Sequence, residues 1–363
     1  MPLDRITLET FRNHTATRLD GTRPLNLLVG ENGAGKTNVL EALSLLAPGR
    51  GLRRAALGDM AGTAKNGIVG GGFAVSARLG STENPVQLGT AIQPERPGRR
   101  IVAVNGAEAS AVSLGEWLAL AWLTPAMDRL FADSAGARRR YMDRLALALD
   151  PAHARHASRY EAALRERNRL LADAPEPDAA WLTSLEMQMA ETGAALAQGR
   201  ARLVEVLAAE LAEYPEAPFA RPSLTYVPGG ALEEAALAQE LAESRRRDRA
   251  AGRSLSGPHR DELLVTMAGH DTPAAQCSTG EQKALLIAIT LAHAGLAARD
   301  RPGVLLLDEV AAHLDPIRRA ALFERLQASG AQVWLTGTEL APFDGLANDA
   351  AVWRVTAGEV ERL

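Results

Sequence analysis

The sequence lacks the features that mark disulfide-stabilised, secreted or membrane-spanning proteins. One cysteine, Cys277, in 363 residues excludes a disulfide within the chain and favours a reducing compartment. Near the N-terminus, Asp4, Arg5 and Glu9 lie where a secretory signal needs an uninterrupted apolar segment. The most apolar stretch, 285–298, is shorter than the roughly 20 residues of a membrane-spanning helix. We therefore expect a cytoplasmic protein with no membrane partner.

Aromatic residues are also scarce, and the chain has no excess of positive charge. Aromatics are 4% of the chain and the formal net charge is −4, so no overall positive field attracts phosphates and a nucleic-acid site must be a local patch. Few aromatics argue against base-stacking platforms and favour contact with a duplex backbone. Two arginine groups are the candidates for DNA contact, with a solvated helix face as the alternative for each. They are Arg138, Arg139 and Arg140, and Arg245, Arg246 and Arg247.

Strand and helix patterns alternate at both chain ends, whereas the middle is helical. Apolar runs at 25–29, 304–307 and 332–336 predict buried strands, and period-two alternation over 68–112 predicts an antiparallel meander. From about residue 125, two long helices are predicted, followed by an arginine-rich linker. In the second helix leucine or methionine recurs every seven residues, while two glycines argue against one unbroken helix. These positions are Leu182, Met189, Leu196, Leu203, Gly193 and Gly199.

Residues 30–37, GENGAGKT, match the phosphate-loop pattern between a predicted strand and a predicted helix. Glycines let backbone N–H groups turn toward phosphates, while Lys36 would reach the β- and γ-oxygens and Thr37 would ligate Mg²⁺. A glycine-rich turn without a ligand is the alternative, and the complete pattern in this setting favours the phosphate loop. The predicted nucleotide contacts are Gly30, Glu31, Asn32, Gly33, Ala34, Gly35, Lys36, Thr37 and Asn38.

Residues 304–309, VLLLDE, place two carboxylates at the carboxyl end of a buried strand, where parallel sheets carry their chemistry. Asp308 would hold Mg²⁺, and Glu309 would orient or deprotonate the attacking water. An apolar strand that ends in Asp-Glu is often only structural, but the phosphate loop earlier in the chain favours catalysis. Glu309, Lys36 and Asp308 are the predicted catalytic residues.

Three further segments complete a set of ATPase motifs. Ser278 and Glu281 have the spacing of a capping box. With Gly280 in its first turn, this helix start also resembles the signature that ATP-binding cassette proteins present to nucleotide held by a partner subunit. Residues 311–315, AAHLD, resemble the D-loop of that superfamily, with Asp315 as a helix N-cap in either case. Residues 335–339 have threonines where many cassette ATPases carry a γ-phosphate-sensing histidine, which predicts slow hydrolysis and a switch rather than a motor.

These elements predict an α/β fold, an ABC-type ATPase head formed by both chain ends with an inserted α-helical arm. We expect the N-terminal half of the head, with the phosphate loop and the β meander, over 1–122. The helical arm is expected over 123–250. The C-terminal half, with the signature, the Asp-Glu strand and the D-loop, is expected over 251–363.

The remaining segments resemble the RecF family. LETFRNH at 8–14, followed by the phosphate loop, TNVLEA and a basic turn, is similar to the start of that family, which usually has tyrosine where this chain has His14. Residues 122–151, residues 159–171 and SGPHRDEL at 256–263 continue the resemblance in order over essentially the whole chain. The alternative for SGPHRDEL is a proline turn that opens a strand, with Arg260 and Asp261 as a surface pair.

The resemblance implies an ATP- and Mg²⁺-dependent DNA-binding protein of recombinational repair and replication restart. It would act in the response to DNA damage at single-stranded gaps, bind duplex, gapped or junction DNA, and help RecR and RecO to load recombinase. ATP would lie between Lys36 and Thr37 of one copy and Ser278 and Gly280 of another. The two copies would close head to tail, and weak, DNA-stimulated hydrolysis to ADP and phosphate would release them. Arg12, by resemblance to related heads, would reach the nucleotide from the first strand.

Three other functions share some of these motifs. A transporter's nucleotide-binding subunit needs the switch histidine and a surface for membrane partners, and neither is evident. A chromosome-scale clamp would carry hundreds of heptad residues where this chain has a helical insertion of about a hundred. A scaffold that binds ATP without turnover stays open, because Glu309 is present and the histidine is not.

Overall fold

The computed structural model describes residues 3–62, 71–80, 84–96, 98–173, 178–215, 217–269, 272–311, 314–347 and 349–363. The chain forms two compact units. The first contains residues 1–128, 216–219 and 286–363, and the second contains residues 129–215 and 220–285. Both chain ends therefore build one α/β unit, as the sequence predicts. Residues 251–285, which the sequence division assigns to the head, group with the second unit.

The first unit contains a six-stranded sheet in the order β15-β14-β3-β13-β12-β8. Its strands are β3 (Leu25–Val29), β8 (Ala119–Leu123), β12 (Gly303–Leu307), β13 (Gln332–Gly337), β14 (Ala351–Thr356) and β15 (Glu359–Arg362). All neighbours pair in parallel except β14 and β15. The strands predicted at 25–29, 304–307 and 332–336 are confirmed. Because both faces of β3, β8 and β13 are buried, these strands are mainly apolar and do not alternate between apolar and polar residues.

The second sheet of this unit is antiparallel, in the order β2-β1-β4-β5-β6-β7. It consists of β1 (Leu3–Phe11), β2 (His14–Asp20), β4 (Phe73–Leu79), β5 (Val86–Ile92), β6 (Arg100–Val104) and β7 (Ala107–Ala109). The predicted meander forms its greater part, and β6 and β7 are joined at Asn105 and Gly106, whose φ angles of 50° and 81° suit this tight turn. The first two strands of the chain extend the sheet.

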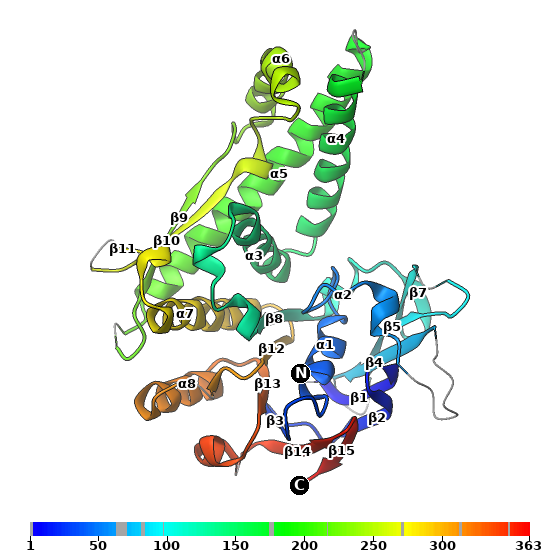
Figure 1. The fold of residues 1–363 in the computed structure, drawn as a ribbon, viewed down its shortest axis with the longest axis vertical. Helices are drawn as coiled ribbons and strands as arrows, with labels where there is room; N and C mark the ends of the chain where they lie inside the picture. The colour runs from blue at the N-terminus through cyan, green and yellow to red at the C-terminus, as the bar shows by residue number, and fades with distance from the viewer. Residues whose placement is uncertain are drawn as a thin grey trace. The chain divides into compact units, whose positions relative to one another are not determined.

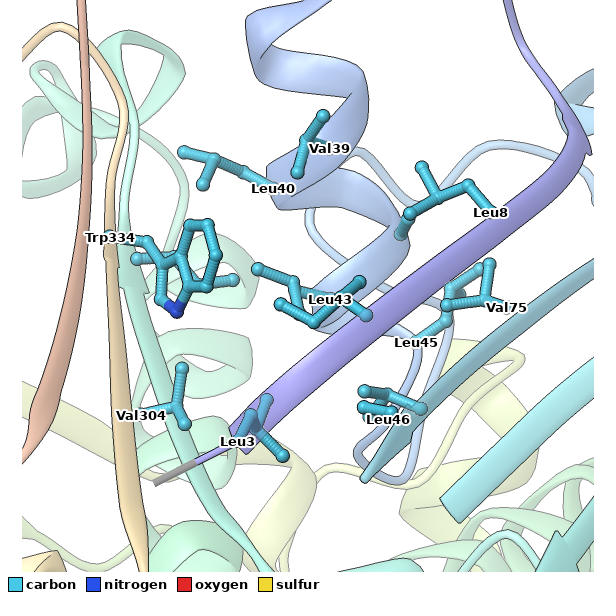
Figure 2. Packing of buried hydrophobic residues seen from close by; sticks show 14 of the residues in the cluster. Leu3, Leu8, Val39, Leu40, Leu43, Leu45, Leu46, Val75, Val304 and Trp334 are labelled. Carbon is cyan, nitrogen blue, oxygen red and sulfur yellow. The ribbon is translucent and has the colours of Figure 1, made fainter. Parts of the chain in front are cut away.

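Helix α1 (Lys36–Ser44) packs between the two sheets. Leu40 and Leu43 of this helix lie beside Trp334 of β13, while Leu8 of β1 and Val75 of β4 approach from the antiparallel sheet (Figure 2). All five side chains are at most 1% exposed. Each such burial stabilises the fold by about 1.5–3 kcal/mol, so the helix that follows the phosphate loop is fixed from both sides.

Apart from α8, the other helices of the first unit are short. They are α2 (Leu114–Trp117), α8 (Pro316–Ala328), α9 (Asp344–Ala347) and the 3-10 helices η1 (Leu57–Met60), η2 (Pro125–Met127) and η7 (Ala341–Phe343). Helix α7 (Thr279–Ala297) begins in the second unit and ends in the first. The N-cap predicted at Asp315 is confirmed, because Asp315 Oδ1 accepts from Arg318 N at 3.0 Å; past the other end of α8, Gly330 has a φ of 68°. Within the described ranges, no helix combines the length and apolarity needed to cross a membrane.

The second unit is mainly helical (Figure 1). It contains α3 (Ala135–Leu149), α4 (His153–Asp173), α5 (Ala179–Ala212), α6 (Glu234–Ala251), and the 3-10 helices η3 (Leu130–Ala132), η4 (Pro258–Arg260) and η5 (Ala274–Gln276). A small antiparallel sheet has the order β11-β10-β9, from β9 (Pro222–Val227), β10 (Glu262–Met267) and β11 (Thr272–Pro273).

Two expectations for this helical unit are wrong. The arginine-rich segment is not a linker, because it belongs to α6, which buries Leu237 and Leu241 against α4 and α5. Helix α5 runs unbroken through its two glycines, because they permit close packing. A Cβ at Gly193 would lie 3.0 Å from Leu237, and one at Gly199 would lie 3.0 Å from His153. The heptad leucines and methionine of α5 are buried as expected.

Asp261 of the SGPHRDEL segment is buried rather than part of a surface pair with Arg260. It accepts from Arg200 Nη1 at 2.8 Å and from the Tyr226 hydroxyl at 2.6 Å. Arg200 also donates to both carboxylate oxygens of Asp143, so this guanidinium joins α3, α5 and the start of β10. A buried carboxylate is costly unless a group buried beside it donates hydrogen bonds to it, and Arg200 is such a group.

His259 supplies a pH-dependent term to the stability of this unit. Its Nε2 lies 2.9 Å from Ser254 O, which can only accept, and its Nδ1 lies 2.8 Å from the Tyr160 hydroxyl. The neutral ring satisfies both contacts, and burial lowers the pKa of His259 below its ordinary 6.5. The ring's contribution is therefore complete above pH 6.5 and is lost as pH falls through the lowered pKa, because the unfolded ring protonates more readily.

We expect His259→Gln to flatten this dependence. Thermal melting between about pH 7.5 and about pH 5 measures it, since histidine titrates in this range. The melting temperature of the variant should fall less steeply with acidification than that of the unsubstituted protein. Equal slopes would show that His259 is not the titrating group.

Candidate nucleotide site

The phosphate-loop segment lies between β3 and α1, at the carboxyl edge of the parallel sheet. Gly35 has a φ of 118°, and a Cβ there would lie 2.8 Å from Asn13 and His14, so only glycine fits. Gly30 passes so close to β14 that a Cβ would lie 2.2 Å from Val355 O. These two constraints give the segment its turn, and the start of α1 adds free backbone N–H groups to it.

Lys36 is folded across this loop. Its Nζ donates to Gly30 O at 2.7 Å and to Glu31 O at 2.9 Å, and the residue is 4% exposed. Burial lowers the pKa of Lys36, while the nearby charges of Glu309 and Asp308 raise it. The ammonium group is thus held against the backbone whose N–H groups are suited to bind phosphate oxygens.

Thr37 and Asp308 meet although 270 residues separate them in the chain. Thr37 Oγ1 donates to Asp308 Oδ1 at 2.9 Å, and Thr336 Oγ1 donates to the same oxygen at 2.8 Å. Burial raises the pKa of Asp308, and these two hydrogen bonds oppose that shift. A threonine hydroxyl beside a carboxylate is the oxygen donor set that Mg²⁺ takes, so the two side chains fit that ion. Sequence reasoning missed the role of Thr336 as a partner of Asp308.

Glu309 follows β12 in a left-handed conformation with a φ of 53°, which is uncommon for a residue with a Cβ. Its N–H donates to Thr336 Oγ1 at 2.9 Å. The same hydroxyl therefore fixes the backbone of Glu309 and the side chain of Asp308. Strained residues of this kind are frequent where a side chain must be aimed at a reacting group.

Comparison with known proteins shows the family of the chain. The family model for the RecF/RecN/SMC N terminal domain matches residues 2–348. A protein of Mesorhizobium japonicum named DNA replication and repair protein RecF is 47% identical and covers 99% of this chain and 97% of its own. The protein of that name from Brucella suis is 46% identical over 98% of this chain and 95% of its own. The chain belongs to the RecF family.

Solved structures show that the fold is that of RecF. The structure of the recombination mediator protein RecF-ATPrS in the RecFOR pathway superposes with a TM-score of 0.86 at 21% identity, covering 100% of this chain and 98% of that one. An Smc head domain from Pyrococcus furiosus, with an extended coiled coil, gives a TM-score of 0.55 at 16% identity, covering 99% and 95%. The α/β head with an inserted helical arm is thereby confirmed.

Two more residues of the predicted nucleotide site are Asn38, in the first turn of α1, and Arg12, which contacts that helix. Arg12 Nε and Nη2 donate to the two oxygens of the buried Glu41, each at 2.9 Å, and Arg12 Nη1 donates to Asp59 O at 2.7 Å. Asn38 Nδ2 donates to Asn13 Oδ1 at 2.7 Å. Arg12 is therefore anchored on α1 through Glu41, and its contact with nucleotide stays a prediction.

The signature residues belong to the second unit and form the predicted capping box. Ser278 N donates to Glu281 Oε2 at 2.8 Å, and Glu281 N donates to Ser278 Oγ at 3.3 Å. Ser278 and Gly280 are both exposed. Asp315 caps α8 and is also exposed, while residues 312–313 of the D-loop segment lie outside the described residues.

The six arginines predicted to touch DNA divide into two kinds. Arg138 forms a two-pronged ion pair with Glu262 at 2.7 and 2.8 Å, Arg139 donates to Asp261 O at 3.0 Å, and Arg245 pairs with Glu186 at 3.0 Å. These three hold the second unit together. The remaining three are exposed: Arg140, Arg246 and Arg247.

Proposed function

We propose that this RecF-family chain is an ATP-dependent DNA-binding protein of recombinational repair and replication restart. The observation that carries the proposal is the meeting of Lys36, Thr37 and Asp308 at the carboxyl edge of the parallel sheet. It is supported by the relatives named DNA replication and repair protein RecF and by the RecF structures whose names include ATP and ATPrS. Work on chromosomal DNA would place the protein in the cytoplasm.

The residues of the site have distinct tasks in hydrolysis. The loop N–H groups and Lys36 bind the β- and γ-phosphates, and Thr37 and Asp308 hold Mg²⁺, which when bound neutralises charge on those oxygens. Glu309 orients a water and accepts its proton as the water oxygen bonds to the γ-phosphorus and the bond to ADP breaks. Thr336 occupies the region of the sensing histidine in related ATPases and supplies only a hydroxyl, which supports slow turnover.

A second copy completes the site. Ser278 and Gly280 at the exposed start of α7 of that copy cap the γ-phosphate, and its Asp315 lies at the same interface. Binding of ATP thus shifts two copies toward a head-to-tail dimer, and hydrolysis removes the γ-phosphate that holds them. Sedimentation with ATP and with ADP tests this step. Dimers in ATP alone are expected, and monomers in both nucleotides would contradict it.

The closed dimer is the form that binds DNA and the protein partners. The RecFOR pathway named for the matching structure supports RecR and RecO as partners that assist recombinase loading at single-stranded gaps. DNA that binds the closed dimer stimulates hydrolysis by favouring the complete site. The exposed arginines Arg140, Arg246 and Arg247 are the better candidates for phosphate contacts, because Arg138 and Arg245 are already paired with carboxylates.

The double substitution Arg246→Ala and Arg247→Ala is expected to weaken duplex binding and its salt dependence. If each side chain neutralises one phosphate, the slope of log K against log salt falls by about 1.8. Fluorescence anisotropy of labelled duplex at several salt concentrations measures this slope. The matched control removes two charges from α4, Arg165 and Arg169, which pair with Glu161 and Glu166. Equal slopes in the test and control variants would exclude the α6 pair as the DNA contact.

A further inference from the structure

The outer side of the phosphate loop is held by the turn between β1 and β2. Asn13 Nδ2 donates to Ala34 O at 2.9 Å, and His14 Nε2 lies 3.0 Å from Gly35 O. Gly358 N, from the turn between β14 and β15, also donates to Ala34 O at 2.8 Å. Two turns far apart in the sequence therefore bind consecutive carbonyls of the loop.

The protonation of His14 follows from its partners. Gly35 O can only accept, so Nε2 must carry a hydrogen. Nδ1 lies 2.9 Å from Thr17 Oγ1, which itself lies 3.1 Å from Gly358 O. His14 is completely buried, and burial lowers the pKa of its imidazole below the ordinary value, while the Thr17 hydroxyl donates its hydrogen to Gly358 O. The hydrogen bond to the loop does not depend on adding a second proton.

Peptide geometry connects these outer contacts to the phosphate side. In a planar trans peptide the C=O and the N–H of the same unit point in opposite directions. Fixing Ala34 O outward therefore directs Gly35 N–H inward, and fixing Gly35 O directs Lys36 N–H. Gly35 O also accepts the first bonds of α1 from Asn38 N and Val39 N, so His14 attaches the beginning of that helix to β2.

We propose that Asn13 and His14 are positioning residues that set the affinity of this site for the triphosphate of ATP. They do not touch the nucleotide, but they hold the two backbone N–H groups that do. The inference rests on the proposed function, because it assumes that the loop binds phosphate. Close packing supports the assignment, since even one methyl group at Gly35 would collide with both side chains.

Four variants test the proposal. Asn13→Ala removes the donor to Ala34 O from an exposed residue, and His14→Met removes the donor to Gly35 O while keeping an apolar side chain of similar size. His14→Gln keeps an N–H near the position of Nε2 and is the rescue variant. Thr15→Val, on the neighbouring residue of β2, is the control. Fluorescent ATP binding, kcat, KM and nucleotide-free melting temperature are measured for each.

Loss of one such buried bond is expected to weaken ATP binding and raise KM about tenfold. The value of kcat should stay within about twofold, because the same phosphate contacts persist through the reaction. His14→Gln and Thr15→Val should bind ATP like the unsubstituted protein. If Asn13→Ala and His14→Met bind as tightly as the unsubstituted protein, or if they only lower the melting temperature, the inference is overturned. If the unsubstituted protein does not bind ATP, it is the proposed function that fails.

Discussion

Replacement of Lys36 by methionine is expected to lower the affinity for ATP by at least about 100-fold, since a hydrogen-bonded charge of this kind is worth on the order of 3 kcal/mol. The ammonium group donates to Gly30 O and Glu31 O, so it already lies within the loop that is expected to bind phosphate. Methionine keeps the length of the side chain and removes the charge. Titration with fluorescent ATP measures the change.

The same substitution should leave the fold intact or slightly more stable without nucleotide. Burial lowers the pKa of Lys36, which means that the charged side chain is costly where it lies. Arg18→Met serves as the control, because it removes an exposed positive charge from the same unit. If Lys36→Met binds ATP within about threefold of the unsubstituted protein, the binding free energy changes by less than about 1 kcal/mol. That result would show that Lys36 does not bind the nucleotide.

Glu309→Gln is expected to slow hydrolysis by about 100-fold or more, the usual effect of losing a general base. Glutamine keeps the shape of the side chain and the N–H contact with Thr336, so ATP binding should persist. The ATP-bound dimer should then accumulate, because the step that releases it is blocked. Phosphate release and dimer lifetime after dilution are the two measurements.

Glu324→Gln is the matched control, since Glu324 is an exposed glutamate of α8 in the same unit and is not part of the phosphate-loop site. It should hydrolyse ATP at the rate of the unsubstituted protein. An unchanged dimer lifetime in Glu309→Gln would contradict the release switch. If hydrolysis were also unaffected, the reaction would not use Glu309 as its base.

Local patterns account for what could be predicted of the fold. Apolar runs identified β3, β12 and β13, and the cap residue Asp315 identified the start of α8. The sequence predicts a linker in place of helix α6, because arginines dominate the segment and its apolar stripe is short. That stripe is evident only from its contacts with α4 and α5. The sequence could not predict that α5 is unbroken, because its glycines are required only by the side chains of other helices that pack closely against them.

Some residues of the candidate site could likewise be predicted from the sequence, and others could not. The sequence motifs themselves predict the roles of Lys36, Thr37 and Asp308. These residues lie close together because parallel strands end at one edge of the sheet. Asn13 and His14 act on main-chain carbonyls, and no pattern in the sequence reveals which carbonyl a side chain reaches. The arginines predicted to contact DNA are identified in the sequence by their charge alone. Their ion pairs with Glu262 and Glu186 are evident only in the structure.

The central claim is that ATP controls the binding of DNA. It is tested most directly by fluorescence anisotropy of labelled duplex titrated with the protein in ATP and Mg²⁺, in ADP, in EDTA without nucleotide, and with Lys36→Met in ATP and Mg²⁺. We predict salt-sensitive binding in the first condition and little in the other three. DNA binding that is absent, or equal in all four conditions while ATP is still hydrolysed, would contradict the account.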